Sequence, residues 1–253
     1  MSKNYELLQQ AEFGLGATPT FTTGENAVAV KSLAPTTQQD LASLEPVVRE
    51  EALKLVQRLF LTGDKAAPKS VLFAPIDAHI GSNWLCAVTA KLLAKSVPGS
   101  VCLVEGNFRK PSLPDTLGLN ADLGLVDSLE QEGPIKDFAK RIGPDNLWFL
   151  ASAAFMQDST TLLHSDRMKN RLNEVRKEFD YVVMNAPPLT AFADGMVLGR
   201  LVDGVVLVLD AQATRREVAV RVTESLRTSN IPVLGAVLNN RTFPIPAAVY
   251  KRL

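Results

Sequence analysis

The stretch VLFAPIDAHIGSNWLCAVTAKLLAK, residues 71–95, decides the fold that the sequence predicts. It opens with the apolar run Val71–Ala74, crosses a loop that contains one glycine, Gly81, and continues as a helical segment from Trp84 to Lys95. A strand that is apolar at every position, rather than at alternate positions, is typical of parallel sheets that helices cover on both faces. The stretch therefore predicts a strand–loop–helix unit of an α/β protein.

The same kind of unit recurs along the chain. Continuously apolar runs predict further strands at residues 101–104, 147–150, 181–184, 204–209 and 233–238. Helical segments lie between or beside these strands, at residues 162–178, 193–201 and 215–229. Strand–helix alternation over roughly 180 residues predicts an α/β fold with a doubly wound, mostly parallel sheet flanked by helices. Ligands of such sheets bind at the carboxyl ends of the strands, so the loops that follow the strands are the candidate site.

Both ends of the chain are predicted to be tails. Residues 1–45 lack a sustained periodicity apart from a short amphipathic helix at Tyr5–Phe13, and we expect a flexible N-terminal tail. An apolar stripe with helical spacing then runs from residue 44 to residue 61. We expect the α/β domain to span residues 46–243 and a C-terminal tail to occupy residues 244–253.

Composition narrows the classes of function. The 253 residues are 46% hydrophobic and 21% charged, which excludes wholesale disorder. Lys+Arg 27 against Asp+Glu 27 leaves no net charge, so the broad basic excess of a nucleic-acid-binding protein is absent and no nucleic-acid partner is predicted. The sequence shows no apolar run of about 18 residues and no signal-peptide core. Two cysteines without metal-site spacing suit a reducing compartment, and a cytoplasmic location is expected.

The first candidate loop follows residues 71–74 and departs from a phosphate-binding loop. Such a loop needs several glycines, so that backbone N–H groups converge, and a lysine for the β- and γ-phosphate oxygens. Here Gly81 is the only glycine and the first lysine is Lys91, while Asp77 would repel phosphates. Two interpretations remain open: Ser82 is a magnesium-binding hydroxyl, or Ser82 or Asn83 merely caps the following helix.

Three further strand ends carry polar side chains. Glu105, Arg109 and Lys110 follow the strand at 101–104 and could orient a phosphate and a metal ion, or form an ordinary solvated strand end. Asn185 stands where P-loop proteins have a magnesium-organising aspartate. Asn239 follows the strand at 233–238 and either contacts a base edge or turns the chain. No Ser/His/Asp set accompanies these residues.

Three stretches match, in order, the motifs of a known family. Ala74–Thr89 aligns without gaps with the pattern S-x-x-P-G-E-G-K-S-T-x-A-x-N-L-A, and Leu103–Leu113 matches L-I-D-A-D-L-R-R-P-S-L. Leu162–Pro188 follows L-L-x-S-x-R-M and then Y-D-Y-V-I-I-D-T-P-P. The run of residues 50–240 thus resembles the bacterial tyrosine kinases (BY-kinases) of capsule and exopolysaccharide synthesis, which are relatives of the MinD/ParA ATPases. The resemblance implies a P-loop NTPase fold of the MinD/ParA type.

The phosphate loop departs from the family at the positions that bind phosphate. Two glycines of the motif are Ala78 and Ile80, the lysine is Gly81 and the threonine is Asn83, whereas Ser82 is kept. Loss of the lysine removes a charge-assisted phosphate contact, and a β-branched residue resists the backbone shape of an anion-binding loop.

The carboxylates of the family are altered as well. The two aspartates of the second motif are Glu105 and Asn107, and the aspartate of the third motif is Asn185; we expect these to be vestigial, with no catalytic residue in this chain. By resemblance, a vestigial nucleotide pocket is expected at Asp77, Ala78, His79, Ile80, Gly81, Ser82, Asn83, Arg109 and Asn239. We expect weak or absent binding of ATP and Mg²⁺, and no metal site except through Ser82.

The family resemblance then implies a function. We expect a catalytically impaired BY-kinase homologue that regulates or scaffolds exopolysaccharide or capsule biosynthesis, at the inner face of the membrane, together with a membrane polysaccharide copolymerase or an active kinase paralogue. The family's oligomerisation helix corresponds to Glu51–Gln57, so a homo-oligomer through this helix is open, whereas the family's C-terminal tyrosine cluster is reduced to Tyr250. The alternatives are an active ATP-dependent tyrosine autokinase with a divergent pocket, and a MinD/ParA-like positioning or adaptor module.

Overall fold

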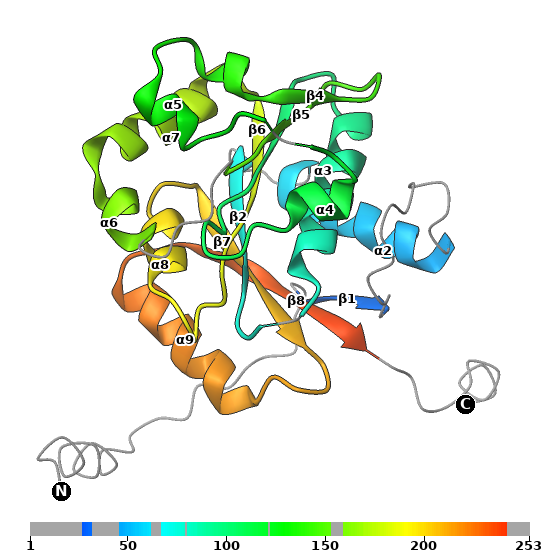
Figure 1. Ribbon diagram of the computed structural model, residues 1–253. Coiled ribbons are helices and arrows are strands. Elements are labelled where there is room, and N and C mark those ends of the chain that lie inside the picture. Colours follow the sequence, from blue (N-terminus) through cyan, green and yellow to red (C-terminus); the bar gives the residue numbers. More distant parts are fainter. Residues whose placement is uncertain are drawn as a thin grey trace, which may run out of the picture.

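A single sheet organises the computed structural model, which describes residues 27–31, 46–61, 67–78, 80–120, 122–152 and 159–241. Within these residues eight strands lie in the order β1-β8-β7-β2-β6-β3-β5-β4 (Figure 1). Every neighbouring pair is parallel except β4 and β5, which are antiparallel. The strands are β1 Ala27–Lys31, β2 Ser70–Pro75, β3 Val101–Val104, β4 Lys140–Ile142, β5 Leu147–Leu150, β6 Tyr181–Asn185, β7 Gly204–Asp210 and β8 Val233–Arg241.

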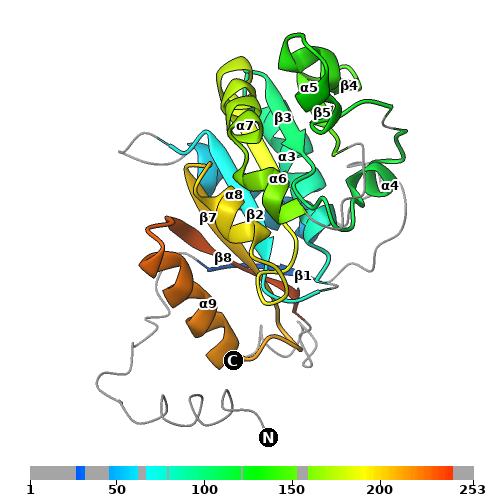
Figure 2. The ribbon, with the colours of Figure 1, turned by 60° about the vertical axis from the view of Figure 1, so that its left-hand side comes forward.

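Helices cover both faces of this sheet (Figures 1 and 2). The helices α2, α3 and α4 and the π-helix η3 contribute to the apolar core on one face, and α5 to α9 and the 3₁₀-helix η4 lie with the core on the other. The helices are α2 Pro46–Val56, η3 Gln57–Leu61, α3 Ser82–Ser96, α4 Leu113–Leu117, α5 Asp127–Glu130, η4 Ile135–Phe138, α6 Ser159–His164, α7 Asp166–Glu178, α8 Asp194–Gly199 and α9 Arg216–Thr228.

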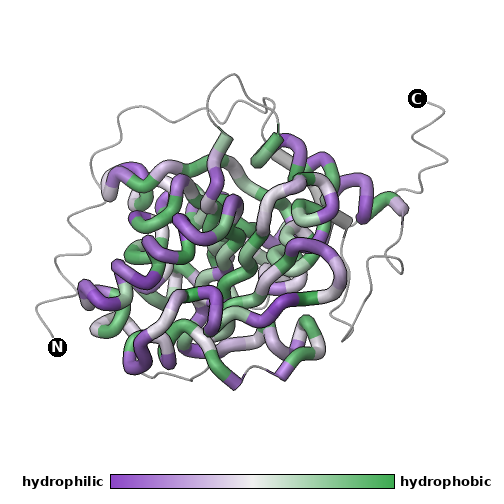
Figure 3. The backbone as a smooth tube through the Cα atoms, turned by 90° about the horizontal axis from the view of Figure 1, so that it is seen from above, coloured by the Kyte–Doolittle hydropathy of each residue, from purple (hydrophilic) through white to green (hydrophobic). Residues whose placement is uncertain are grey.

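The continuous apolar runs of the sequence become strands that are buried on both faces. In β2, Val71 and Phe73 pack into the core beneath α2 and α3, whereas Leu72 and Ala74 pack into the core beneath α7 and α8. All four are fully buried, because successive side chains of a strand point to opposite faces. Figure 3 shows the same arrangement, with hydrophobic segments gathered centrally and hydrophilic ones along the outer helices.

The sequence predicts this sheet well, and the expected strands and the doubly wound architecture are confirmed. One expected helix, at residues 162–178, is instead two helices, α6 and α7. Ser165 ends the first and caps the second, because its hydroxyl accepts a hydrogen bond from the backbone N–H of Met168 at 3.2 Å. No helix in the described part of the chain combines the length and the apolar character needed to cross a membrane.

The N-terminal region holds a second difference. Residues 27–31, which the sequence places in a flexible tail, form β1 and pair with β8 at the edge of the sheet. This expectation was wrong because a five-residue edge strand gives too short a pattern to stand out from its surroundings. The predicted helix at residues 5–13 and the predicted tail at 244–253 lie outside the described residues, and the division of the chain into tails and domain stays a prediction.

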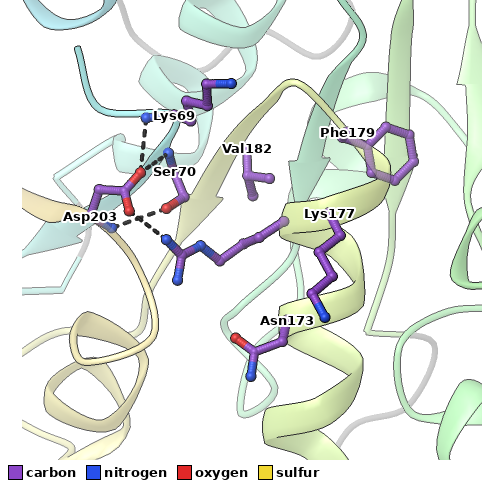
Figure 4. Close-up of a pocket in the computed structure, with 8 residues that line it drawn as sticks. Lys69, Ser70, Asn173, Lys177, Phe179, Val182 and Asp203 are labelled. Carbon is purple, nitrogen blue, oxygen red and sulfur yellow. Dashed lines mark hydrogen bonds and ion pairs between the residues drawn. The ribbon is translucent and has the colours of Figure 1, made fainter. Parts of the chain in front are cut away.

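At the amino ends of β2 and β7, a carboxylate holds the two strands in register. The Asp203 carboxylate accepts hydrogen bonds from the backbone N–H groups of Lys69 (2.9 Å) and Ser70 (2.8 Å) and pairs with Arg176 of α7 (Figure 4). These side chains border a surface cavity of about 400 Å³ at the edge of the sheet where β2 begins. Burial alone raises the pKa of Asp203, but the hydrogen bonds from Ser70 and Lys69 and the charge of Arg176 outweigh burial and lower it.

We predict that Asp203→Ala lowers the free energy of unfolding by about 1–3 kcal/mol at neutral pH, because it leaves two backbone N–H groups without their acceptor. A carboxylate with a lowered pKa stabilises the fold above its unfolded pKa of 3.8 and loses this effect as the pH falls through the folded value. Urea unfolding of the unchanged chain and of Asp203→Ala should therefore show a difference in the free energy of unfolding that becomes smaller as the pH falls into the acid range. Asp166→Ala, whose side chain is 93% exposed, is the matched control and should change stability by less than about 0.5 kcal/mol.

Candidate functional site

The loops after β2, β3 and β6 meet at the carboxyl edge of the sheet, where they border a cavity of about 500 Å³. Its lining residues are Pro75, Asp77, Ala78, Ile80, Gly81, Ser82, Asn83, Asn107, Arg109, Lys110, Ser112, Ala186, Pro188 and Phe192. The structure thus gathers most of the residues that the sequence selects. Three others, Glu105, Asn185 and Asn239, are buried behind this lining, and His79 lies outside the described residues.

The loop that enters α3 is fixed by contacts within the protein. The Ile80 side chain is buried in the core beneath α2 and α3, and its carbonyl oxygen accepts a hydrogen bond from Nδ2 of Asn239 at 2.6 Å. Gly81, which follows, has a φ of +74°, and a Cβ at this position would lie 3.2 Å from the same Nδ2. A lysine here would be strained, because only glycine adopts this backbone conformation readily. Asn239 therefore anchors the loop.

Asp77 places a negative charge on the wall of the cavity. Its carboxylate accepts hydrogen bonds from the hydroxyl groups of Thr190 (3.3 Å) and Thr214 (3.1 Å), which lie in the loops after β6 and β7. Three loops are thereby joined through one side chain. A carboxylate held in this position disfavours a triphosphate nearby, since like charges repel.

Glu105, the first residue after β3, is fully buried and accepts four hydrogen bonds. Its Oε2 accepts from the backbone N–H groups of Ser112 and Leu113, both at 2.8 Å, and so caps the start of α4. Its Oε1 accepts from the backbone N–H of Asn107 at 3.2 Å and from Nδ2 of Asn185. Both oxygens therefore have two donors each, which uses the accepting capacity of a carboxylate.

The asparagines of the site continue this network. Asn185, the last residue of β6, accepts from the backbone N–H of Gly106 at 2.7 Å and donates both to Glu105 and to Oδ1 of Asn83 at 2.8 Å. Nδ2 of Asn83 donates in turn to the Ser112 hydroxyl. Each amide oxygen of this network thus accepts a hydrogen bond from a protein group.

These contacts bear on whether a divalent cation fits. Mg²⁺ takes oxygen ligands, chiefly carboxylates. Burial raises the pKa of Glu105, and the hydrogen bonds from Leu113, Ser112 and Asn185 only partly offset this effect. Both oxygens of Glu105 already accept two protein hydrogen bonds each, and the amide oxygens of Asn185 and Asn83 accept one each, so the one carboxylate of this network has no accepting position left and the network does not fit Mg²⁺. The described residues include no group of three or more His, Cys, Asp and Glu side chains that could hold a metal ion.

Arg109, which the sequence selects as a phosphate contact, is engaged elsewhere. Its guanidinium donates from Nε and Nη2 to the two carboxylate oxygens of Asp194, at 2.9 and 3.1 Å, and lies over the Phe192 ring at 4.4 Å from its centre. Asp194 is fully buried at the start of α8 and also accepts from the hydroxyl of Ser159. Removing Arg109 would leave the buried Asp194 charge uncompensated, so the pair holds the Arg109 guanidinium, whose side chain is 21% exposed, against the start of α8.

Sequence reasoning missed the partners that fix the site. Asp194, Thr190 and Thr214 bind residues that lie 85 to 137 positions away in the chain. The sequence carries one signal for them, because they follow strands or begin a helix at the same edge of the sheet. Lys110 lines the cavity and is exposed.

Comparison with known proteins places this geometry in context. No family model matches the chain. The tyrosine-protein kinase YwqD of Bacillus subtilis is 30% identical over 173 residues, which cover 68% of this chain and 73% of that protein. The structure of the chimerical protein CapA2B2 superposes with a TM-score of 0.76 at 18% identity, over 85% of this chain and 93% of that one.

A cell-division complex, MinC:MinD of Aquifex aeolicus, matches with a TM-score of 0.56 at 19% identity, over 73% of this chain and 72% of that chain. The expected MinD/ParA-like P-loop NTPase fold is thereby confirmed.

We predict that Asn185→Asp destabilises the protein by about 2 kcal/mol at neutral pH, because it sets a second carboxylate against buried Glu105 and removes an N–H donor. Like charges raise the pKa of both groups, so the loss should shrink as the pH falls and the pair takes up a proton. Denaturant unfolding between neutral and mildly acidic pH measures this effect. Asn173→Asp, on the exposed face of α7, is the matched control; a loss equal in both variants would contradict the prediction.

Proposed function

We propose that this chain, which belongs to the bacterial tyrosine-protein kinase family, is a catalytically impaired member that regulates or scaffolds exopolysaccharide or capsule biosynthesis. The hydrogen bonds around Glu105 support the impairment most directly. Phosphoryl transfer depends almost wholly on positioning and on charge stabilisation by metal ions and cations. A carboxylate whose oxygens all accept protein hydrogen bonds offers neither a metal ligand nor a base.

The cations of the site support the same proposal. The lysine of the family motif is Gly81, whose backbone has the left-handed conformation, and the Arg109 guanidinium is bound to Asp194. These losses concern one catalytic unit, so their effects are not additive, and restoring a single group restores little.

An intact fold without its catalytic groups suits a binding role. The two apolar cores are fully formed, and the overall fold matches that of the chimerical protein CapA2B2 over 85% of the chain. We propose that the protein acts in the cytoplasm at the inner face of the membrane, where it docks to a membrane polysaccharide copolymerase or an active kinase paralogue. The segment Glu51–Gln57, on α2 and the first residue of η3, is the proposed contact between copies. Its Lys54 pairs within the helix with Glu51 at 2.8 Å and Glu50 at 3.3 Å, and Val47 of the same helix is 57% exposed.

One observation favours an alternative, an active ATP-dependent tyrosine autokinase with a divergent pocket. The relative that shares 30% identity is named a tyrosine-protein kinase. A MinD/ParA-like positioning module is the other alternative, supported by fold similarity alone. Neighbouring genes discriminate between the proposed function and the positioning module: glycosyltransferase and chain-length genes favour the proposed function, and partition or flagellar genes favour a positioning module.

We predict that the purified chain forms no phosphotyrosine when incubated with ATP and Mg²⁺, as followed by γ-phosphate labelling beside the YwqD kinase as positive control. Titration calorimetry with Mg-ATP should show that the double variant Ile80→Gly, Gly81→Lys binds at least about tenfold more tightly than the unchanged chain. The lysine restores a charge-assisted phosphate contact, and a glycine at position 80 gives the loop the backbone freedom to accommodate it.

The matched control is Ile80→Gly, Gly81→Ala, which makes the same backbone change without the ammonium group. Removing the buried Ile80 side chain costs about 2–5 kcal/mol of stability, so melting curves of both variants establish that they are folded. Steady autophosphorylation of the unchanged chain would refute the proposed function.

A further inference from the structure

A second cavity lies at the amino ends of the strands, at the opposite edge of the sheet from the candidate site. Its volume is about 400 Å³, within the range of small-molecule sites. Its walls come from the second half of α7, from the starts of β2 and β6 and from the segment before β7. The polar side chains among them are Lys69, Ser70, Asn173, Arg176, Lys177 and Asp203 (Figure 4). None of the described residues lines both cavities.

Positive charge exceeds negative charge in this cavity. Three cationic side chains, those of Lys69, Arg176 and Lys177, line it together with one carboxylate, that of Asp203. The carboxylate is engaged by the protein, because it accepts two backbone N–H groups at the start of β2 and pairs with Arg176. The side chain of Lys69 points away from α7, and its charge acts on the neighbouring carboxylate of Asp180. The uncompensated positive charge therefore lies on the α7 side, where it favours an anion.

One face of α7 carries hydrogen-bond donors that the protein does not use. Asn173, Arg176 and Lys177 are three and four residues apart, so their side chains lie on the same face of the helix. The Arg176 guanidinium has five N–H donors, of which one binds Asp203 and one binds the carbonyl oxygen of Leu201. The Lys177 ammonium and the Asn173 amide form no hydrogen bond or ion pair with any described residue. These donors are available to the oxygens of a ligand.

The neighbouring carboxylates of α7 are bound to other cations. Glu174 pairs with Arg171, with 2.8 Å between the carboxylate oxygen and the guanidinium nitrogen. Glu178 pairs with Lys136 at 2.9 Å. Each acidic group thus has its own partner, and the Lys177 ammonium keeps its charge for a ligand.

We propose that this cavity binds a small anion, a phosphate or a carboxylate, through Arg176 and Lys177, with the Asn173 amide as a further donor. Guanidinium and ammonium groups form strong charge-assisted hydrogen bonds with both acids. Phe179 and Val182, each 2% exposed, give the cavity an apolar floor, and a less polar surrounding strengthens such contacts. The site is separate from the impaired pocket, so the inference does not rest on the proposed function.

Titration calorimetry of the full chain tests this proposal with pyrophosphate, citrate and glycerol, at constant ionic strength and without Mg²⁺. We expect both anions to bind at millimolar concentration or below, and glycerol, which carries no charge, not to bind. The anion that binds more tightly identifies the acid that the cavity prefers, and either order supports the proposal.

Two variants with matched controls locate the contact. Lys177→Ala should raise Kd for the tighter anion about three- to tenfold, because it removes a charged donor. Asn173→Asp should raise it about tenfold or more, because it sets a carboxylate beside the anion. Lys169→Ala and Asn170→Asp make the same changes of charge on α7 at residues that do not line the cavity, and should leave Kd within about twofold. Lys177 and Asn173 are exposed, and melting curves verify that all four variants are folded.

Absence of binding by both anions at millimolar concentration would overturn the proposal, and the cations at the end of α7 would then only complement the helix dipole. Binding that all four variants leave unchanged would also overturn it, because the anion would lie elsewhere. Equal weakening by all four variants would do the same, because the anion would respond to net charge alone. None of these results bears on phosphotyrosine formation, so the proposed function is tested separately.

Discussion

The buried carboxylate of Glu105 is the constraint on which the site depends. Its four hydrogen bonds join the end of β3, the start of α4 and the end of β6, so three loops take their positions from one side chain. The next residue must be a glycine, Gly106, because the chain passes so close to β6 that a Cβ at this position would lie 2.3 Å from the carbonyl oxygen of Asn185. A buried charge is tolerated only when its hydrogen bonds are complete. Here the groups that complete the hydrogen bonds of Glu105 lie in the segments that border the cavity.

The sheet could be predicted because its signal is local. Each strand of the interior is a continuous apolar run, and burial on both faces follows from that run alone. Where the signal is short or mixed, the prediction is wrong or incomplete: β1 is an edge strand of five residues, and β4 has three residues that are exposed or half-buried. The break at Ser165 between α6 and α7 depends on a single capping hydrogen bond. The spacing of apolar residues does not reveal such a cap.

The sequence predicts which residues form the site, but not which of them bind one another. Motif positions select Asp77, Ser82, Arg109 and Asn185, and these do come together because parallel strands end at one edge. The hydrogen bonds of the site join residues that lie 80 or more positions apart in the chain, such as Arg109 and Asp194. The sequence does not show which donor binds which acceptor across such separations. The sequence predicts that Arg109 contacts phosphate, because arginine is a cation. In the structure the charge of Arg109 is already compensated by Asp194.

The side chains around Glu105 are neutral, and this neutrality goes together with the lack of a fitting metal site. Two carboxylates within hydrogen-bonding distance in a buried place repel each other unless a cation or proton lies between them. An amide at position 185 removes that repulsion and adds an N–H donor, and the amide at position 83 extends the donor chain to Ser112. A carboxylate reintroduced at position 185 alone would therefore recreate the repulsion without the cation that relieves it. The network is therefore self-consistent as a structural unit without a cation.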